Sequence, residues 1–161
     1  MDNSNQLLIS LEERHANNIL SGKKTVELRR RKMHVEEGAI VWLYVKTPIA
    51  AVVGYAEVSD HQYAAPSTIW RKLGGVTGLH YKEFKSYFAD STKAFALGLK
   101  NPRALETPIK LTELRELSQN FQPPQFYLKV LMKSPLQRLL AKSITSKARL
   151  KKHAIQEELA M

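Results

Sequence analysis

The sequence predicts one α+β domain: a mixed, partly closed β-barrel of six or seven strands, with short flanking helices and a C-terminal helical extension. The chain has 161 residues, 43% of them hydrophobic, which suffices to bury one core. Short segments with the two-residue period of strands are interspersed with short segments of helical spacing. No Gly/Ser linker or internal repeat interrupts residues 6–133, and Pro135 follows directly. We therefore expect a domain over residues 1–133 and an extension over residues 134–161.

The first segment predicts a strand followed by a helix. Leu7 to Leu11 has the composition of a short strand, and Ser10 and Glu13 have the spacing of a capping box for a helix that runs to about Ser21. Gly22 is suited to end this helix in the left-handed conformation, which glycine enters without steric cost. The apolar stripe of the helix consists of Ala16, Ile19 and Leu20.

Three further strands are predicted before residue 60. Ala39 to Val45 is almost wholly apolar, which is typical of a strand buried on both faces. Ala50 to Val58 follows a turn at residues 46–49, so we expect these two segments to form a central hairpin. Thr25 to Arg31 alternates as a strand does. One of its faces carries Val26, Leu28 and Arg30, and the other carries Thr25, Glu27, Arg29 and Arg31.

The rest of the domain predicts two short helices and then more strands. Helical spacing extends over Pro66 to Leu73 and over Tyr81 to Ala89, and the glycine pair at 74–75 separates the two. Thr112 has the right side chain to cap a short helix that ends near residue 117. The candidate strands are Lys93 to Leu99, Thr107 to Leu111 and Gln125 to Leu131.

The charge of the chain favours a polyanionic partner. Lysine and arginine number 25 against 15 acidic residues, for a net charge of +10 and a pI near 9.8. Such an excess raises the expectation of nucleic-acid binding. The extension is dense in positive charge and has leucines at helical spacing, which predicts a basic amphipathic helix. This helix either packs against the domain or binds nucleic acid or a protein partner.

Several classes of protein are disfavoured. The chain has no cysteine, which excludes disulfides, thiolate zinc sites and cysteine nucleophiles. Its longest apolar run, residues 39–45, is far short of the ~20 residues that span a bilayer. The five histidines show no metal-ligand spacing, and neither a P-loop nor a dinucleotide fingerprint occurs. We expect a cytoplasmic protein with no signal peptide, no membrane attachment, no metal ion and no cofactor.

One short motif carries specific information. Gly22, Lys24, Glu27 and Arg29 form the pattern G-x-K-x-x-E-x-R between the predicted first helix and the next strand. In this context the motif resembles that of the ASCH family, whose members are small PUA-like β-barrel domains. The resemblance covers roughly residues 6–131 and extends to the opening strand and helix and to the segment at residues 123–126.

The resemblance implies a ligand site in a cleft between the first helix and the barrel. PUA-like domains are mostly RNA-binding modules, and ASCH members have been associated with nucleic-acid binding and with ribonuclease activity. A small amidohydrolase branch is associated with N4-acetylcytidine hydrolysis by a lysine, a threonine and a late glutamate. Lys24 matches that lysine, but Glu27 occupies the position of the threonine, and Glu83 is the nearest acid to the late glutamate. The missing threonine argues against amidohydrolase chemistry.

The residues themselves predict a binding site as well. In a strand, Glu27 and Arg29 lie on one face, close enough for an ion pair, and a nearby lysine can hold a phosphate. One alternative is a metal-independent hydrolase of RNA or a modified nucleoside, with Lys24 and Glu27 as acid and base. The other is an exposed strand with a structural salt bridge worth at most ~1 kcal/mol. The predicted nucleic-acid-binding residues are Lys23, Lys24, Glu27, Arg29, Arg30 and Arg31.

The aromatic residues fall into two groups. Trp42 and Tyr44 lie in the most apolar segment, which favours core packing over base stacking. Tyr63 and Trp70 lie in the connecting region, where base stacking and a small satellite core are both open.

Overall fold

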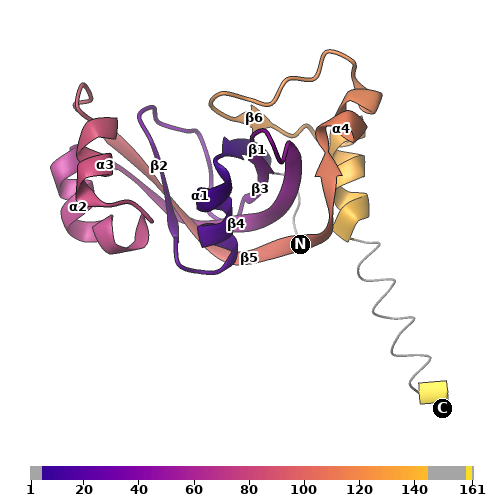
Figure 1. The fold of residues 1–161 in the computed structure, drawn as a ribbon, viewed down its shortest axis with the longest axis horizontal. Helices are drawn as coiled ribbons and strands as arrows, with labels where there is room; N and C mark the ends of the chain where they lie inside the picture. The colour runs from indigo at the N-terminus through magenta and orange to yellow at the C-terminus, as the bar shows by residue number, and fades with distance from the viewer. Residues whose placement is uncertain (1–4, 145–158, 161) are drawn as a thin grey trace.

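A six-stranded sheet forms the centre of the computed structural model, which describes residues 5–144 and 159–160 (Figure 1). The strand order within these residues is β2-β5-β4-β3-β1-β6. β1 runs parallel to β3, and all other neighbours are antiparallel, so the predicted mixed sheet is confirmed. The strands are β1 (Gln6–Leu11), β2 (Val26–Arg29), β3 (Ile40–Val45), β4 (Ala51–Ala64), β5 (Ala94–Lys110) and β6 (Leu128–Lys129).

The sheet curls into a half-barrel. Its register shifts once between β3 and β4 and three times between β4 and β5. Such bulges bend a strand and increase its twist. β5 accordingly runs along most of the molecule, from the end that carries α2 and α3 to the end that carries α4 (Figure 1). β2 and β6 form the two edges, and an opening remains between them.

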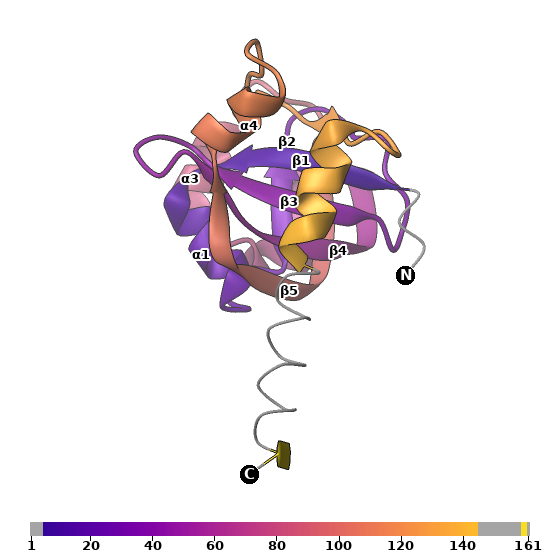
Figure 2. The same ribbon diagram turned by 90° about the vertical axis from the view of Figure 1, so that its right-hand side faces the viewer.

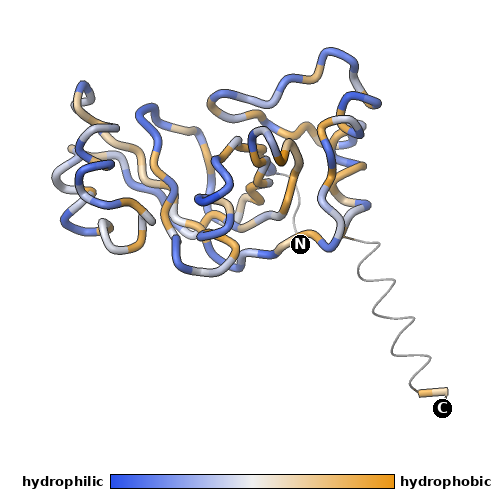
Figure 3. Tube along the Cα trace, viewed as in Figure 1, coloured by the Kyte–Doolittle hydropathy of each residue, from blue (hydrophilic) through white to orange (hydrophobic). Residues whose placement is uncertain are grey.

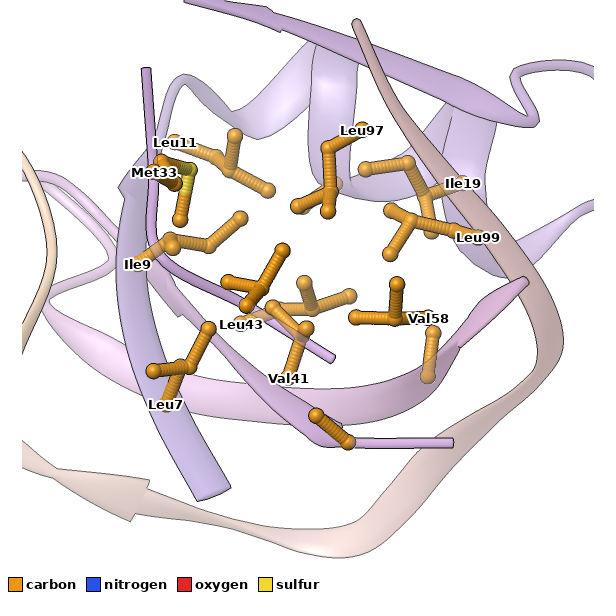
Figure 4. Packing of buried hydrophobic residues seen from close by; sticks show 14 of the residues in the cluster. Leu7, Ile9, Leu11, Ile19, Met33, Val41, Leu43, Val58, Leu97 and Leu99 are labelled. Atoms are coloured by element: carbon orange, nitrogen blue, oxygen red, sulfur yellow. The ribbon is translucent and has the colours of Figure 1, made fainter. Parts of the chain in front are cut away.

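The interior of the half-barrel holds the main apolar core. Alternate residues of β1 (Leu7, Ile9, Leu11) and of β3 (Val41, Leu43, Val45) point into it, and their side chains are at most 3% exposed. Figure 4 shows the side chains of the β1 residues and of Val41 and Leu43 converging with Val58, Leu97 and Leu99 from the two long strands. Helix α1 (Glu13–Leu20) adds Ile19 to this cluster. The hydropathy of the chain follows this arrangement, since the central strands are largely hydrophobic in Figure 3.

A second apolar cluster covers the outer face of β1 and β3. Leu8, Trp42 and Tyr44 pack there against α4 (Leu111–Leu117) and against the helical residues 135–144. Figure 2 shows that last helix lying across the strands. The core position of Trp42 and Tyr44 is therefore confirmed, with exposed fractions of 1% and 2%.

The beginning of the predicted extension takes part in this second cluster. Leu140 is fully buried there, and Leu136, Leu139 and Ile144 pack against it. Leu150 and Ile155 lie outside the described residues. The division of the chain at residue 134 and a protein partner for the predicted C-terminal helix stay predictions.

A third apolar cluster lies at the opposite end of the molecule. The helices α2 (Pro66–Leu73), η1 (Gly74–Val76) and α3 (Tyr81–Tyr87) gather there beside β2 (Figure 1). Ile69 and Phe84 from these helices pack on Val26 and Leu28, which confirms these two members of the predicted face. This packing fixes β2 from one side and leaves its other side to the functional site. Arg30, predicted for the same face, lies beyond the end of β2 and lines the cleft on the opposite side.

Two predicted helix caps are wrong. Ser10 does not cap α1, because it belongs to the β1 ladder opposite Tyr44, and the N-cap of the helix is Glu12 without a side-chain cap. Thr112 lies inside α4, whose N-cap is Lys110. The carboxylate of Glu113 accepts the Lys110 backbone N–H at 2.8 Å.

Two strand predictions also change. Lys93 to Leu99 and Thr107 to Leu111 were expected as separate strands, but pairing with the long β4 joins most of both into β5. Asn101, with φ +50°, lies at one of the register shifts between β4 and β5. The segment Gln125 to Leu131 pairs only over Leu128–Lys129, since its contact with β1 is two residues long.

Candidate functional site

The motif strand β2 places two charged side chains on the interior face of the half-barrel, at its open edge. Glu27 pairs across the ladder with Leu97 and Arg29 with Phe95, both members of the interior core. Directly opposite residues of neighbouring strands share a face of the sheet. Glu27 and Arg29 therefore continue the interior surface at the point where the sheet stops.

The glycine of the motif brings Lys24 to the same place. Gly22 has φ +84°, a left-handed conformation that lets the chain turn sharply after α1. The backbone N–H of Lys24 then donates to Asn18 O at 2.9 Å. The side chain is 2% exposed, and its Nζ donates to the carbonyl oxygen of Thr77 at 2.5 Å.

Three charges form a buried chain. Lys24 Nζ lies 3.3 Å from Glu27 Oε1, and Arg29 Nη2 lies 3.2 Å from Glu27 Oε2. Burial alone would raise the pKa of Glu27, but the charges of Lys24 and Arg29 outweigh it and hold that pKa below its usual range. Burial lowers the pKa of Lys24, and Glu27 opposes this only in part. The predicted pair of Glu27 and Arg29 is present, but the strand that carries it is buried, so the exposed-strand alternative is wrong.

Arg29 bridges the opening of the half-barrel. Its Nη2 donates to Ser10 O of β1 and its Nη1 donates to Phe126 O, just before β6, both at 3.1 Å. The guanidinium thus connects the β2 edge of the sheet to the opposite edge. The guanidinium also donates to Glu27 Oε2, so three partners fix the position of Arg29.

A cavity of about 570 Å³ opens beside this chain of charges. The end of β1, the helix α1, the strand β2 and the helix α3 enclose it. A volume of this size suits a small-molecule or nucleotide ligand. Its walls include Lys24, Glu27 and Arg29, so the motif residues converge on an open cleft.

Two polar atoms in this cleft have no partner. Ser10 Oγ and His15 Nδ1 are buried without a hydrogen bond to any described residue, and both residues line the cavity. Burial and the nearby Lys24 lower the pKa of His15, so its imidazole is neutral at pH 7. A buried polar atom without a partner is costly, and a bound ligand would supply that partner.

The rim of the cleft is largely basic. Arg14 of α1 forms a bidentate pair with Glu83 of α3, at 2.5 and 3.2 Å, across the mouth. Arg30 donates to Tyr87 O at 2.8 Å and lies 4.1 Å from the centre of the Tyr87 ring. Lys46, at the end of β3, is exposed. The lining contains five lysines and arginines against three carboxylates, so the cleft favours an anionic ligand.

Four of the six predicted binding residues line the cleft: Lys24, Glu27, Arg29 and Arg30. Lys23 is not part of the lining, and Arg31 instead lies 4.7 Å from the centre of the Phe126 ring. Four further lining residues were not predicted from the sequence as part of the site: Ser10, Arg14, His15 and Lys46. Ser10 could have been predicted from the sequence, since a polar serine interrupts an otherwise apolar strand. The others have no distinctive spacing, and only the fold brings them to the motif.

Two further expectations concern catalysis. Among the described residues, no group of three or more His, Asp or Glu side chains is placed to hold a metal ion. Independence of metals stays a prediction. Glu83 does reach the cleft, but it is paired with Arg14. The expectation that amidohydrolase chemistry is absent stays a prediction. In the described part of the chain, no helix combines the length and hydropathy needed to cross a membrane.

The comparisons with known proteins agree with the fold. No family model matches the sequence. An ASCH domain-containing ribonuclease of Zymomonas mobilis subsp. mobilis is 36% identical over 141 residues, which are 88% of this chain and 93% of that protein. The crystal structure of ASCH from Zymomonas mobilis has a TM-score of 0.80 at 33% identity and covers 87% of this chain and 96% of that one. Human THYN1, solved with 5-methylcytosine-containing DNA, is similar in fold alone, with a TM-score of 0.53 at 13% identity over 87% of this chain and 98% of that one.

The curled mixed sheet, with a charged cleft at its open edge, defines a PUA-like α+β domain. The similarity to the Zymomonas protein extends over nearly the full length of both sequences. The chain belongs to the ASCH domain family.

Proposed function

We propose that this protein binds single-stranded RNA and holds one nucleotide in the cleft beside Lys24, Glu27 and Arg29. The observation that carries this proposal is the cavity of about 570 Å³ with two buried, unpartnered polar atoms in its wall. A net charge of +10 suits a polyanionic partner. The relative at 36% identity is named a ribonuclease, which supports RNA as the ligand. The absence of cysteine from the sequence supports the cytoplasm as the compartment.

Each part of the cleft has a distinct role in this proposal. Ser10 Oγ and His15 Nδ1 form hydrogen bonds with the base or ribose, since neither atom has a partner among the described residues. Lys46 and Arg30 at the rim contact phosphates. Glu27 and Arg29 hold the wall in place through their mutual pair and the two carbonyl contacts of Arg29.

A titration of labelled single-stranded RNA at several salt concentrations tests the proposal. Each phosphate contact contributes about −0.7 to the slope of log K against log salt. Lys46→Ala removes one exposed cation of the rim and is expected to weaken binding and make the slope shallower by about 0.7. Lys100→Ala is the matched control, because Lys100 is also exposed but does not line the cleft. If Lys46→Ala and Lys100→Ala weaken RNA binding equally, or if the affinity does not depend on salt, the proposal that RNA binds in the cleft is wrong.

A second function, cleavage of the bound RNA, is favoured by the state of His15. Its Nδ1 is unpartnered, and its lowered pKa leaves the ring able to accept a proton at pH 7. We assign it as the base that takes the proton of a ribose 2′-OH. The 2′ oxygen then attacks the adjacent phosphorus, and the bond from phosphorus to the 5′ oxygen breaks. Lys24, whose pKa is lowered, supplies a proton to that leaving oxygen.

Glu27 is a positioning residue in this scheme. Both of its oxygens are engaged, and its pKa lies below the usual carboxylate range, which makes it a weak base. The geometry therefore favours His15 and Lys24 over the pair of Lys24 and Glu27 that the sequence suggested. The products are a 2′,3′-cyclic phosphate and a free 5′-OH.

Incubation of labelled RNA with EDTA present distinguishes this activity from simple binding. Wild-type protein is expected to produce cyclic phosphate ends, and His15→Ala and Lys24→Ala are each expected to reduce the rate at least tenfold while RNA remains bound. A substrate with a single 2′-deoxy nucleotide at the cleaved position should be resistant. Cleavage that both variants retain would identify a contaminating nuclease and would contradict the assignment.

A further inference from the structure

A second cavity, of about 480 Å³, lies between the helices α2 and α3. Its walls contain the aromatic rings of Trp70, Tyr81, Phe84 and Phe88. None of these residues lines the first cleft. The second cavity is therefore a separate feature of the surface, in a part of the molecule that the proposed function does not use.

Helix α3 separates the two cavities. Glu83, Ser86 and Tyr87 line the first cleft, whereas Tyr81, Phe84 and Lys85 line the second cavity. With 3.6 residues per turn, these two sets fall on opposite faces of the helix. A helix with its side chains is about 10–12 Å across. An extended chain that leaves the cleft therefore reaches the second cavity by crossing one helix.

The indole of Trp70 is held in place by its neighbours. Its centroid lies 4.9 Å from that of Phe84 and 5.4 Å from that of Tyr81. On another side it rests on Gly74, where an added Cβ would come within 2.9 Å of the ring. Glycine at this position thus permits the indole to lie against the end of the helix. The resulting aromatic wall is preorganised for a planar ligand.

Core packing explains only part of this wall. Phe84 and Phe88 are 3% and 4% exposed and belong to the third apolar cluster, with Trp70 packed against it. Tyr81 is 53% exposed and belongs to none of the apolar clusters of the described residues. Its ring therefore extends the aromatic wall toward solvent without contributing to a core.

The charges around the second cavity are of one sign. Arg71 and Lys85 line it, and among the described residues no carboxylate does so. Both cations are exposed, and neither forms an ion pair with another described residue. The exposed ring of Tyr81 and the half-buried ring of Trp70, together with two cations that have no partner among the described residues, match the surfaces on which single-stranded nucleic acids stack their bases.

We infer that the cavity between α2 and α3 is a second nucleobase subsite, where a base near the nucleotide in the cleft stacks on Trp70 and Tyr81. Arg71 and Lys85 contact the phosphates on either side of that base. This inference rests on the proposed RNA binding and specifies its extent: the bound RNA crosses α3 and occupies both of its faces. Stacking tolerates every base, so this subsite adds affinity with little sequence preference.

A length series of oligonucleotides tests the inference with the full chain. A labelled ten-nucleotide RNA can occupy both cavities, whereas a dinucleotide can occupy only one. Tyr81→Ala is expected to weaken binding of the ten-nucleotide RNA about tenfold and to leave dinucleotide binding in the cleft unchanged. Tyr81→Phe keeps the ring and should retain wild-type affinity. Because Tyr81 is exposed, we expect both variants to fold, and the melting temperature of each variant checks this.

Tryptophan fluorescence gives a second readout. The chain has two tryptophans, and Trp42 is buried in the outer core, so stacking of a base should quench the emission of Trp70. The ten-nucleotide RNA is expected to quench the wild type and not Trp70→Phe.

Unchanged binding of the ten-nucleotide RNA by Tyr81→Ala would overturn the second subsite while leaving the cleft intact. Loss of binding in Tyr81→Ala together with no effect of Lys46→Ala would support the stacking subsite and overturn the cleft. No binding of RNA by the wild type would overturn both.

Discussion

The two faces of strand β2 are both buried but chemically opposite. Val26 and Leu28, each 5% exposed, pack in the apolar cluster with Phe84. Glu27 and Arg29, 6% and 9% exposed, face the cleft as members of a chain of charges. Alternate residues of one four-residue strand thus enter two different environments.

This contrast indicates which face of β2 contributes more to the folding stability. Removing a Val or Leu side chain from water contributes roughly 1.5–3 kcal/mol. Burying an ion costs several kcal/mol, which only good geometry and further hydrogen bonds offset, and apolar replacements of similar shape are often as stable. The apolar face is therefore the simpler way to anchor β2. The charged face is better explained by the cleft it borders than by the stability it provides.

The largest expected effect is that of Glu27→Ala, which removes the centre of the charge chain. Lys24 and Arg29 then remain buried without their carboxylate. Breaking a buried ion pair on one side typically costs about 3–5 kcal/mol. We expect a loss of this size in the free energy of unfolding measured with urea, together with loss of RNA binding at temperatures where the variant is folded.

Glu37→Ala is the control for that experiment, because Glu37 is exposed and does not line the cleft. A destabilisation by Glu27→Ala below about 1 kcal/mol would mean that the pair behaves like a surface salt bridge. The distinction between the two faces of β2 would then fail.

A smaller effect is expected from Val26→Ala, on the apolar face. The variant leaves a space beside Ile69 and Phe84 in the third cluster. Lost burial and the residual space together cost about 1.5–3 kcal/mol. Because Val26 does not line the cleft, RNA affinity of the folded variant should equal that of the wild type. Reduced affinity at unchanged fold would show that the two faces are coupled.

Much of the fold could be predicted because its signals are local. The alternation in β2, the apolar run of β3 and the glycine at position 22 each determine conformation within a few residues, and the structure contains all three. The extent of β5 could not be predicted, since its middle is held as a strand by residues of β4 that lie far earlier in the chain, as in the pair of Arg103 with Tyr55. The predicted cap of α1 was wrong for the same reason, because Ser10 pairs with Tyr44 in the β1 ladder and does not cap the helix.

The candidate site could be predicted only where the motif lies. Spacing placed Glu27 and Arg29 on one face, but it gave no indication that both would be buried. That burial results from Arg29 reaching Ser10 and Phe126 across the opening of the half-barrel. His15 enters the cleft through the packing of α1 on β3 and β5, which no periodicity encodes.

The smallest expected effect is on the pH dependence of the free energy of unfolding. His15 and Glu27 contribute to it in different pH ranges. The charged groups around His15 are Lys24 and Arg14, which disfavour its protonation, and Glu27 and Glu12, which favour it. Burial and then Lys24 dominate, so the pKa of His15 lies below 6.5 in the folded protein. The unfolded chain therefore binds more protons at this residue as pH falls below about 6.5, and the free energy of unfolding decreases.

Glu27 responds at lower pH, because its folded pKa lies below the usual carboxylate range. Its contribution to stability is present above the ordinary carboxylate pKa and is lost as pH falls through that lowered value. Urea unfolding from pH 7.5 to 4.5 is thus expected to show a gradual loss that His15→Asn reduces and that the control His34→Asn, at an exposed position, does not. An unchanged profile in His15→Asn would mean that the imidazole is hydrated in the free cleft. Its unpartnered nitrogen would then no longer support the proposed role as base.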